Sequence, residues 1–339
     1  MAAPKKTLEI RTSPHVLSGH SVDTIMFNVV LALLPATAFS VFAFGLPALL
    51  VLVVAVASCL FTERWLCRVA GRPSTLGDWS ATITGLLYGL TLPPTLPLWM
   101  VAVGGVIAIA LGKALFGGLG SNPFNPALVG RAVLQATFPV SMTTWMPAFD
   151  PERFSRIPGA TLTFPFAEPI YDTVSGATPL ALWKFKGETT DAMQLLTGWV
   201  SGSAGETSAV LILIGGIYLI VRNMMNWRIP VAILATVAAL SAVLHLVDPA
   251  YPAPLFMLFS GGLMLGAMFM ATDMVGSPMT TIGCVVYGVV IGVMVVVIRV
   301  WGGMPEGVMY AILLGNAISP LLDRWFRTKV YGVPRRARA

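Results

Sequence analysis

Charge is scarce in this sequence. Asp, Glu, Lys and Arg make up 11% of the 339 residues, whereas soluble domains carry about 25%. Hydrophobic residues reach 56%, and the mean hydropathy is +0.81. This composition excludes an ordinary soluble domain and indicates a single polytopic protein of the lipid bilayer. The net charge of +6 comes from Lys and Arg that flank apolar runs, which argues against a nucleic-acid partner.

Metal-binding and nucleotide-binding patterns are missing as well. The cysteines lack the C-x-x-C spacing of zinc or iron–sulfur sites, and the histidines are equally scattered. These residues are Cys59, Cys67, Cys284, His15, His20 and His245. We therefore expect no metal site built by this chain alone. The sequence has no Rossmann-type glycine fingerprint, so any nicotinamide chemistry is expected on another chain. The first apolar run begins near Thr24 and is long enough to span, so we expect no cleavable signal.

Ten apolar stretches are present, and they predict an all-α polytopic membrane protein with about ten transmembrane helices. They cover residues 24–44, 45–67, 79–93, 96–116, 125–139, 208–221, 229–247, 254–272, 280–300 and 308–325. The third, fifth and sixth are shorter than the roughly 20 residues that a perpendicular helix needs. Some stretches are therefore expected to be half-helices or to extend into polar sequence.

Basic residues set the expected orientation, because Lys and Arg accumulate in short cytoplasmic loops. With the N-terminus inside, the cytoplasmic segments hold most of them: Lys5, Lys6, Arg11, Arg64, Arg68, Arg72, Arg222, Arg228, Arg324, Arg327, Lys329, Arg335, Arg336 and Arg338. Among the short exterior loops, Arg299 is the exception. Both termini are therefore expected in the cytoplasm, and the long interval 140–207 on the exterior.

The two groups of five stretches resemble copies of each other. A shift of about 185 residues aligns the starts of the stretches. It also matches the spacing from Gly118 to Gly130 with that from Gly303 to Gly315. An odd number of spans per copy inverts the second copy, as in many transporter folds. Chance similarity is the alternative, because Gly and Pro are common in membrane helices.

The predicted division of the chain follows from this five-plus-five inverted repeat. It comprises a cytoplasmic segment 1–23, a first repeat 24–139, an exterior loop 140–207, a second repeat 208–325 and a basic cytoplasmic tail 326–339. Sites in such folds lie where short, interrupted segments of the two halves meet. Here these are the third and eighth stretches, and the fifth and tenth.

The exterior loop contains Asp-Thr-Val-Ser-Gly-Ala-Thr-Pro-Leu at residues 172–180. It looks like the acceptor sequence on which a flavin transferase joins FMN to a threonine hydroxyl, here Thr178, through a phosphoester. The remaining members of the motif are Asp172, Ser175, Gly176 and Ala177. The following proline keeps Thr178 extended. An ordinary surface turn is the alternative, since Ser-Gly and Thr-Pro are common in loops. Its position in the main exterior loop favours attachment.

A second polar segment, Asn122-Pro123-Phe124-Asn125-Pro126, precedes the fifth stretch. Asn followed by Pro initiates helices, and the amides exposed at such a start attract anions or polar ligands. We predict that Asn122, Asn125 and Arg131, roughly two turns on, contact a flavin or another buried polar group. The alternative is a re-entrant turn whose arginine reaches the cytoplasmic interface, and Lys113 has the same two interpretations.

Asp273 lies at the inner end of the eighth stretch. Because ionised carboxylates are costly in hydrocarbon, an acid beside a broken transmembrane helix is a candidate functional residue. We predict a cation pathway that includes Asp273, Thr91 and Thr272, with a solvated loop residue as the alternative. Glu63 lies near an interface and is expected to face water.

Taken together, these segments resemble one family. The residues that carry the resemblance are the 172–180 signature, the Gly-Gly-Leu-Gly-Ser-Asn-Pro-Phe-Asn-Pro-Ala run at 117–127 and the breaks at 90–94 and 271–278. The chain resembles the NqrB/RnfD family. It is most similar to RnfD of the Rnf ion-translocating electron-transport complex and, more distantly, to NqrB of the sodium-pumping NADH:quinone reductase. The resemblance covers nearly the whole chain.

This resemblance implies a multi-pass subunit of a bacterial inner membrane, with FMN covalently bound to Thr178 on the periplasmic side. It also implies a second, non-covalent flavin (riboflavin) among the helices. The complex would couple electron transfer between ferredoxin and NAD to Na⁺ or H⁺ movement. The implied partners are Rnf subunits A, B, C, E and G and the flavin transferase. The competing hypothesis is an inverted-repeat channel or secondary transporter without a redox cofactor.

Overall fold

The computed structural model describes residues 21–165, 167, 176–206 and 208–327, and within these ranges all regular secondary structure is helical. The first half contains α1 (Val22–Phe44), α2 (Leu46–Val69), η1 (Leu76–Asp78), α3 (Ser80–Leu90), α4 (Leu98–Gly112), η2 (Ala114–Phe116), α5 (Pro126–Thr137) and α6 (Pro139–Thr143). The connecting segment contains η3 (Gly159–Leu162), α7 (Pro179–Lys186) and α8 (Ala192–Thr197). The second half contains α9 (Ala209–Val221), α10 (Arg228–Val247), α11 (Pro254–Phe259), α12 (Leu263–Leu265), η4 (Gly266–Met270), α13 (Thr281–Trp301) and α14 (Val308–Trp325).

The prediction of an all-α polytopic membrane protein is confirmed. In the part of the chain that the structure describes, five helices are long and apolar enough to cross a bilayer: α1, α2, α4 with its extension to Phe116, α10 and α13. The shorter apolar helices α3 and α9 accompany them. Each of the ten predicted stretches coincides with one helix or, for the eighth, with a series of short helices. The predicted cytoplasmic segments up to residue 20 and from residue 328 lie outside the described residues.

The eighth stretch is broken into α11, α12 and the π-helical turn η4. The break falls at Ser260-Gly261-Gly262, where Gly261 has a φ of +64°. This is a left-handed conformation that glycine adopts without steric penalty, so the helix stops there and restarts in a new direction. The third stretch is short as well, because α3 ends at Leu90, before Pro93 and Pro94.

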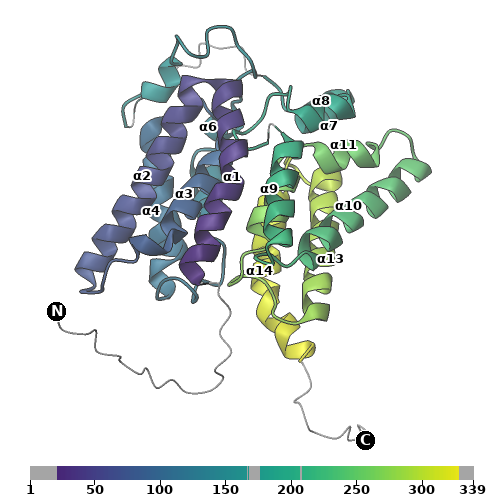
Figure 1. The fold of residues 1–339 in the computed structure, drawn as a ribbon. Helices are drawn as coiled ribbons and strands as arrows, with labels where there is room; N and C mark the ends of the chain where they lie inside the picture. Colours follow the sequence, from purple (N-terminus) through teal and green to yellow (C-terminus); the bar gives the residue numbers. More distant parts are fainter. Residues whose placement is uncertain (1–20, 166, 168–175, 207, 328–339) are drawn as a thin grey trace, which may run out of the picture.

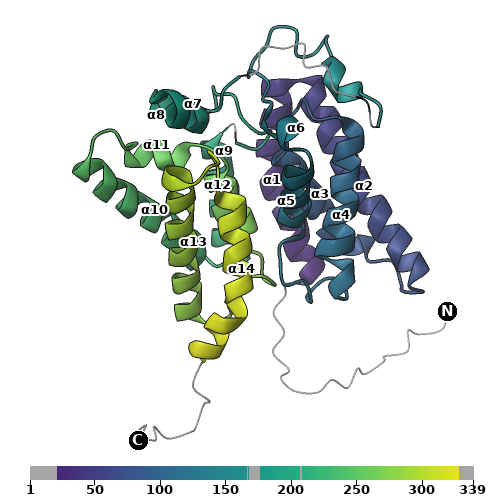
Figure 2. The ribbon, with the colours of Figure 1, turned by 180° about the vertical axis from the view of Figure 1, so that it is seen from behind.

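The two halves run in opposite directions. In Figure 1, α1 begins and α14 ends at one end of the bundle, whereas α9 begins at the other end, beside α8. We call the end that carries α6, α7 and α8 the outer end, and the opposite one the inner end. Seen from behind, α5 and α14 lie centrally where the halves meet (Figure 2). The helix order is therefore that of an inverted repeat.

Equivalent glycines produce equivalent close contacts in the two halves. A Cβ at Gly130 of α5 would lie 2.8 Å from the Gly104 carbonyl oxygen of α4, and one at Gly315 of α14 would lie 2.8 Å from Ile291 of α13. In sequence, Gly130 follows Gly118 at the spacing by which Gly315 follows Gly303. The first helices of the halves also meet, since Tyr218 of α9 donates to Asn28 of α1 at 2.5 Å.

The connecting segment does not lie wholly outside the bundle. Residues 203–206 turn back between the halves, where Ser203 and Ala204 are fully buried. The Ala204 and Gly205 amides donate to the carbonyl oxygens of Leu92 and Leu90, at 3.2 and 2.6 Å. The predicted exterior loop therefore ends in a buried strap, residues 203–206, which satisfies the carbonyl groups at the end of α3.

Candidate functional site

A large cavity opens toward the outer end, between the halves. Its volume is about 690 Å³, within the range of about 300–1,000 Å³ that is usual for small-molecule sites. We call it the outer cavity. Its polar and charged lining includes Arg131 of α5, Thr178 at the start of α7, Glu206 of the strap and Glu306, which precedes α14. It therefore joins the predicted attachment residue to three ionisable side chains.

Thr178 is the N-cap of α7. Its Oγ1 accepts a hydrogen bond from the Ala181 amide at 3.3 Å, its backbone is extended, and Pro179 occupies the first helical position. The residue is only 9% exposed and lines the outer cavity. A helix start favours negative charge, because its amide groups lack partners within the helix. The hydroxyl therefore lies at a helix start that favours a negatively charged group.

The other motif residues divide between the described and the undescribed parts of the chain. Ala177 and Gly176 line the outer cavity. A Cβ at Gly176 would lie 2.5 Å from the Ser201 hydroxyl oxygen, so a larger residue here would require the Ser201 side chain to shift. The Gly176 amide donates to the Trp145 carbonyl at 2.9 Å. Asp172 and Ser175 lie outside the described residues.

Four ionisable residues meet at the inner wall of this cavity, three of them buried and Glu306 partly buried. Arg131 Nη2 lies 3.1 Å from Glu306 Oε2, and the Gly262 amide donates to Glu306 Oε1 at 2.5 Å. Glu206 and Arg299 complete the group, which we call the charge cluster. Arg131 is 8% exposed, so it is a buried polar residue and does not reach the inner interface.

The two carboxyl groups of the charge cluster have opposite pKa shifts. Burial, followed by the charge of Glu306, raises the pKa of Glu206 to about 8, although Arg131 opposes this shift. Burial also acts to raise the pKa of Glu306, but Arg131 and Arg299 outweigh it and hold that pKa below its ordinary value of 4.5. At neutral pH, Glu206 therefore carries a proton and Glu306 is ionised.

The expectation that Arg299 lies in an exterior loop is wrong. Arg299 lies within the last turn of α13 and is completely buried. Its Nη1 and Nη2 donate to the carbonyl oxygens of Met257 and Ser260, at 2.6 and 2.9 Å. These carbonyls belong to α11 and to the break after it, whose groups lose their helical partners. A buried arginine thus stabilises the broken eighth stretch.

Lys184 connects α7 to the charge cluster. Its ammonium donates to the carbonyl oxygens of Arg299 and Met304, each at 3.0 Å, and to that of Gly302. These carbonyls end α13 and begin the connection that carries Glu306. The helix that starts at Thr178 is therefore tied to the segment that holds Glu306.

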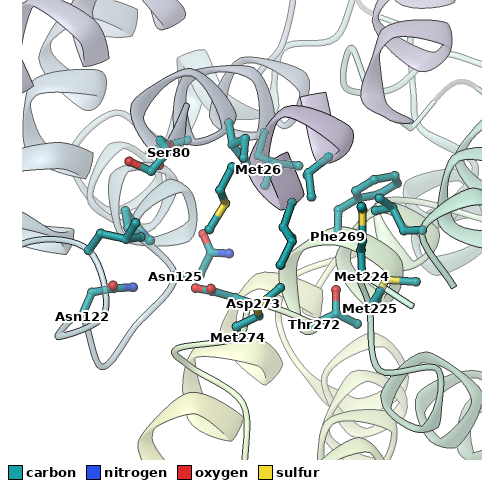
Figure 3. A pocket seen from close by; sticks show the side chains of 18 of the residues that line it. Met26, Ser80, Asn122, Asn125, Met224, Met225, Phe269, Thr272, Asp273 and Met274 are labelled. Carbon is teal, nitrogen blue, oxygen red and sulfur yellow. The ribbon is translucent and has the colours of Figure 1, made fainter. Parts of the chain in front are cut away.

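A second, smaller pocket lies toward the inner end. Its volume is about 100 Å³, and it is lined by Asn122, Asn125, Thr272 and Asp273. Figure 3 shows Asn122, Asn125 and Asp273 facing a common space from the two halves. Aliphatic side chains, methionines and Phe269 supply most of the remaining wall, and Met26, Met224 and Met225 are among them. We call it the inner pocket.

The asparagines of the inner pocket have structural partners. Asn125 is the N-cap of α5, as the Asn-Pro pattern predicts, and its Oδ1 accepts from the Ala127 amide at 3.0 Å. Its Nδ2 donates across the interface to the Met270 carbonyl at 3.3 Å. Asn122 Nδ2 donates to the Phe124 carbonyl at 3.1 Å. Asn122 also hydrogen-bonds the Asp273 carboxylate.

The predicted ion-pathway residues do not form one group. Thr272 and Asp273 line the inner pocket, and the Thr272 hydroxyl donates to the Met268 carbonyl at 2.6 Å. Thr91 lies nearer the charge cluster, beside a void of about 10 Å³ that Arg131 and Glu206 also line. The sequence therefore grouped residues from two different sites.

Glu206 and Glu306 were not identified from the sequence as candidate site residues. The signal that could have indicated them is an acid just before an apolar stretch, at residues 206 and 306.

The expectation that Glu63 faces water is wrong. Glu63 is 4% exposed and forms an ion pair with Lys113 at 2.6 Å. Lys113 is likewise buried at 4% exposure, so it does not reach the interface.

Comparison with known proteins identifies related sequences over nearly the whole chain. The family model described as NQR2, RnfD, RnfE family matches residues 9–332. The chain is 41% identical over 342 residues to the D subunit of the proton-translocating ferredoxin:NAD(+) oxidoreductase complex of Clostridium ljungdahlii, covering 98% of each chain. It is 41% identical over 333 residues to the D subunit of the Na(+)-translocating ferredoxin:NAD(+) oxidoreductase complex of Acetobacterium woodii, covering 97% of this chain and 96% of that one. The D subunit of the ion-translocating oxidoreductase complex of Halorhodospira halophila is 41% identical over 346 residues, with 96% of each covered.

Proposed function

This chain belongs to the NQR2, RnfD, RnfE family, and from that membership we propose that it is the membrane subunit that relays electrons through FMN esterified to Thr178. The complex is an Rnf-type ion-translocating oxidoreductase that transfers electrons between ferredoxin and NAD. The proposed partners are Rnf subunits A, B, C, E and G, and a flavin transferase installs the cofactor. The outer end faces the periplasm and both termini face the cytoplasm.

The observation that carries this proposal is the position of Thr178. Its hydroxyl caps α7 at the wall of a cavity large enough for a small-molecule cofactor. The phosphate of a phosphoester at this oxygen would be stabilised by the start of α7. Arg131 lines the same cavity, and its Nε is buried without a partner among the described residues. The residues present therefore fit an anionic, tethered cofactor.

Each part of the chain has a defined task in this function. FMN supplies the capacity to accept and release electrons one at a time. The helix start at Thr178 and the guanidinium of Arg131 compensate the phosphate charge. Lys184 fixes α7 against the end of α13, and so fixes the attachment point relative to the charge cluster. The apolar helices hold this assembly at the outer face of the membrane.

The inner pocket is the proposed place of the second, non-covalent flavin, riboflavin, or of a passing cation. Apolar side chains flank its walls, and amide and carboxylate groups of Asn122, Asn125 and Asp273 converge on it. Such a combination is typical of sites for planar ligands with polar edges. At about 100 Å³ the pocket is smaller than a typical ligand site, so riboflavin binding requires that its methionine side chains move aside.

In-gel fluorescence tests the proposal. The full chain is produced in cells with an active flavin transferase, denatured in SDS, and inspected for a fluorescent band. We expect fluorescence in the wild type and none in Thr178→Ala, while the matched control Thr197→Ala on α8 and Asp273→Ala both keep it. A dark wild-type band would exclude covalent FMN and would favour the channel or transporter hypothesis. Fluorescence that persists in Thr178→Ala would show that the flavin is attached to another residue.

A further inference from the structure

Glu206 and Glu306 approach the same point of the broken eighth stretch. A Cβ at Gly262 would lie 2.7 Å from Glu306 Oε1 and 3.4 Å from Glu206 Oε1. The charges of the two carboxyl groups act on each other. Among the described residues, no hydrogen-bond partner reaches Glu206 Oε1, which is buried. Because two neighbouring buried carboxylates repel each other when both are ionised, this arrangement favours a proton on one of them.

The surrounding charges decide which carboxyl group holds the proton. Glu306 accepts from Arg131 Nη2 and from the Gly262 amide, and both bonds favour its ionised form. Among the described residues, Glu206 accepts a long bond from the Ser203 amide, at 3.3 Å. Burial therefore keeps Glu206 neutral, whereas the arginines keep Glu306 charged.

Several elements packed around Glu206 present ionisable groups to it. Among the described residues, α5 contributes Arg131, the end of α13 contributes Arg299, and the connection before α14 contributes Glu306. Tyr310 of α14 lines the adjacent cavity. Lys184 of α7 is directed to backbone carbonyls. With one shared proton, the charge cluster carries two positive charges and one negative charge.

The net positive charge lies beside the proposed cofactor. Thr178 and Glu206 line the same outer cavity, and a phosphodiester at Thr178 would carry one negative charge. The negative charge of the phosphodiester and the net positive charge of the charge cluster would then compensate each other while the cofactor is oxidised. An added electron would leave one uncompensated negative charge in a largely apolar surrounding, which is unfavourable unless a proton follows it.

We propose that Glu206 and Glu306 form a proton-binding site that exchanges one proton with the redox group at Thr178, an inference that rests on the proposed function. When that group gains an electron from a one-electron carrier of the complex, Glu206 would release its proton to it and would stay ionised until the group is reoxidised. When the electron then passes to the next carrier, the proton would return to the Glu206 carboxylate.

The chemistry of the cluster favours a proton over a metal cation. Na⁺ requires several oxygen ligands free of competing positive charge. Here the guanidiniums of Arg131 and Arg299 flank the carboxyl pair. A proton needs no additional ligands.

The first test needs no flavin and uses the full chain with Thr178→Ala. Difference infrared spectra between neutral and alkaline pH should show a carboxylic-acid carbonyl band that disappears as Glu206 ionises. The band should be absent in Glu206→Gln and present in the matched control Glu188→Gln, whose side chain is exposed. In Glu306→Gln the band should titrate at lower pH, because a neighbouring negative charge is removed. A band that persists in Glu206→Gln, or that fails to appear in the parent chain, would overturn the proton site.

The second test addresses the exchange with the cofactor. Redox titrations of the flavin-carrying chain at several pH values should show a midpoint potential that falls with pH in the wild type and in Glu188→Gln. In Glu206→Gln the slope should be at most half as steep. An unchanged slope would overturn the exchange and leave the proton site intact. A wild-type chain without flavin would overturn the proposed function instead, and the infrared result would remain valid.

Discussion

The Lys113 ammonium lies 2.6 and 2.8 Å from the two carboxylate oxygens of Glu63, with both side chains buried. It also donates to the Ser80 hydroxyl at 2.6 Å, and the Thr75 hydroxyl donates to Glu63. This arrangement joins the ends of α2 and α4 to the start of α3 near the inner end. A charge in a buried ion pair has lost its hydration, and its partner compensates for that loss. Removing one partner therefore leaves the other charge buried and uncompensated, which is strongly destabilising.

The first prediction concerns this ion pair. Lys113→Met should lower the free energy of unfolding by about 3–5 kcal/mol, because Glu63 remains buried without its partner. The double variant Glu63→Gln, Lys113→Met should recover most of the loss. Thermal unfolding in detergent micelles measures both, and Lys186→Met on the exposed face of α7 serves as the control. Equal destabilisation in the single and double variants would show that the charge pairing is not the cause.

The second prediction concerns the pH dependence of stability. The pKa of Glu206 is about 8 in the folded protein and about 4.5 when the chain is unfolded. The folded state therefore binds more protons between these values, and its stability falls as pH rises through that window. The contribution is complete below pH 4.5 and is lost above about 8. Melting temperatures measured across this range should decline less steeply in Glu206→Gln than in the wild type.

The third prediction concerns Lys184. Lys184→Met should loosen α7 from residues 302–306, because three hydrogen bonds from one ammonium are lost. Hydrogen–deuterium exchange should accelerate at least several-fold in the amides of α7 and of the α13–α14 connection, since a charge-assisted hydrogen bond contributes about 1.5–3 kcal/mol. The exchange of α2 and α4 should not change. Lys186→Met, two residues along the same helix, is the matched control.

The fourth prediction concerns the start of α5. Asn125→Ala should destabilise the protein by about 0.5–2 kcal/mol through loss of the N-cap. Asn125→Asp keeps the capping oxygen but loses the bond to the Met270 carbonyl, so it should retain more of the stability. Chemical denaturation in detergent compares the three chains. If the aspartate variant is as unstable as the alanine variant, the bond across the interface matters more than the cap.

Much of the fold could be predicted from hydrophobic patterning. The tenth predicted stretch has the same bounds as α14, and α10 begins one residue before its predicted start. Long apolar runs leave few alternatives, because backbone groups in a bilayer must be satisfied internally and a helix does so within a single segment. The eighth stretch was less predictable. Its apolar composition is continuous, and only the Ser260-Gly261-Gly262 sequence marks the point at which the helix breaks.

The charge cluster could not be predicted from local sequence. Arg131 and Glu306 are 175 positions apart, and their pairing depends on how α5 and α14 meet across the halves. The sequence points to Thr178 because its motif is local, whereas Glu206 has no such motif. Glu63 was misjudged because its position near a helix end indicates solvent, while its burial depends on Lys113 of a distant helix. Short sequence motifs identify candidate residues, but the tertiary fold determines which distant side chains pair with them.

The buried strap at residues 203–206 limits how the protein can move. It belongs to the chain that starts α9, yet it is hydrogen-bonded to Leu90 and Leu92 of the first half. A transporter that alternates between inward-open and outward-open states by rocking one repeat against the other would have to rupture these bonds in every cycle. The fold therefore favours a static frame in which the two halves keep a constant separation.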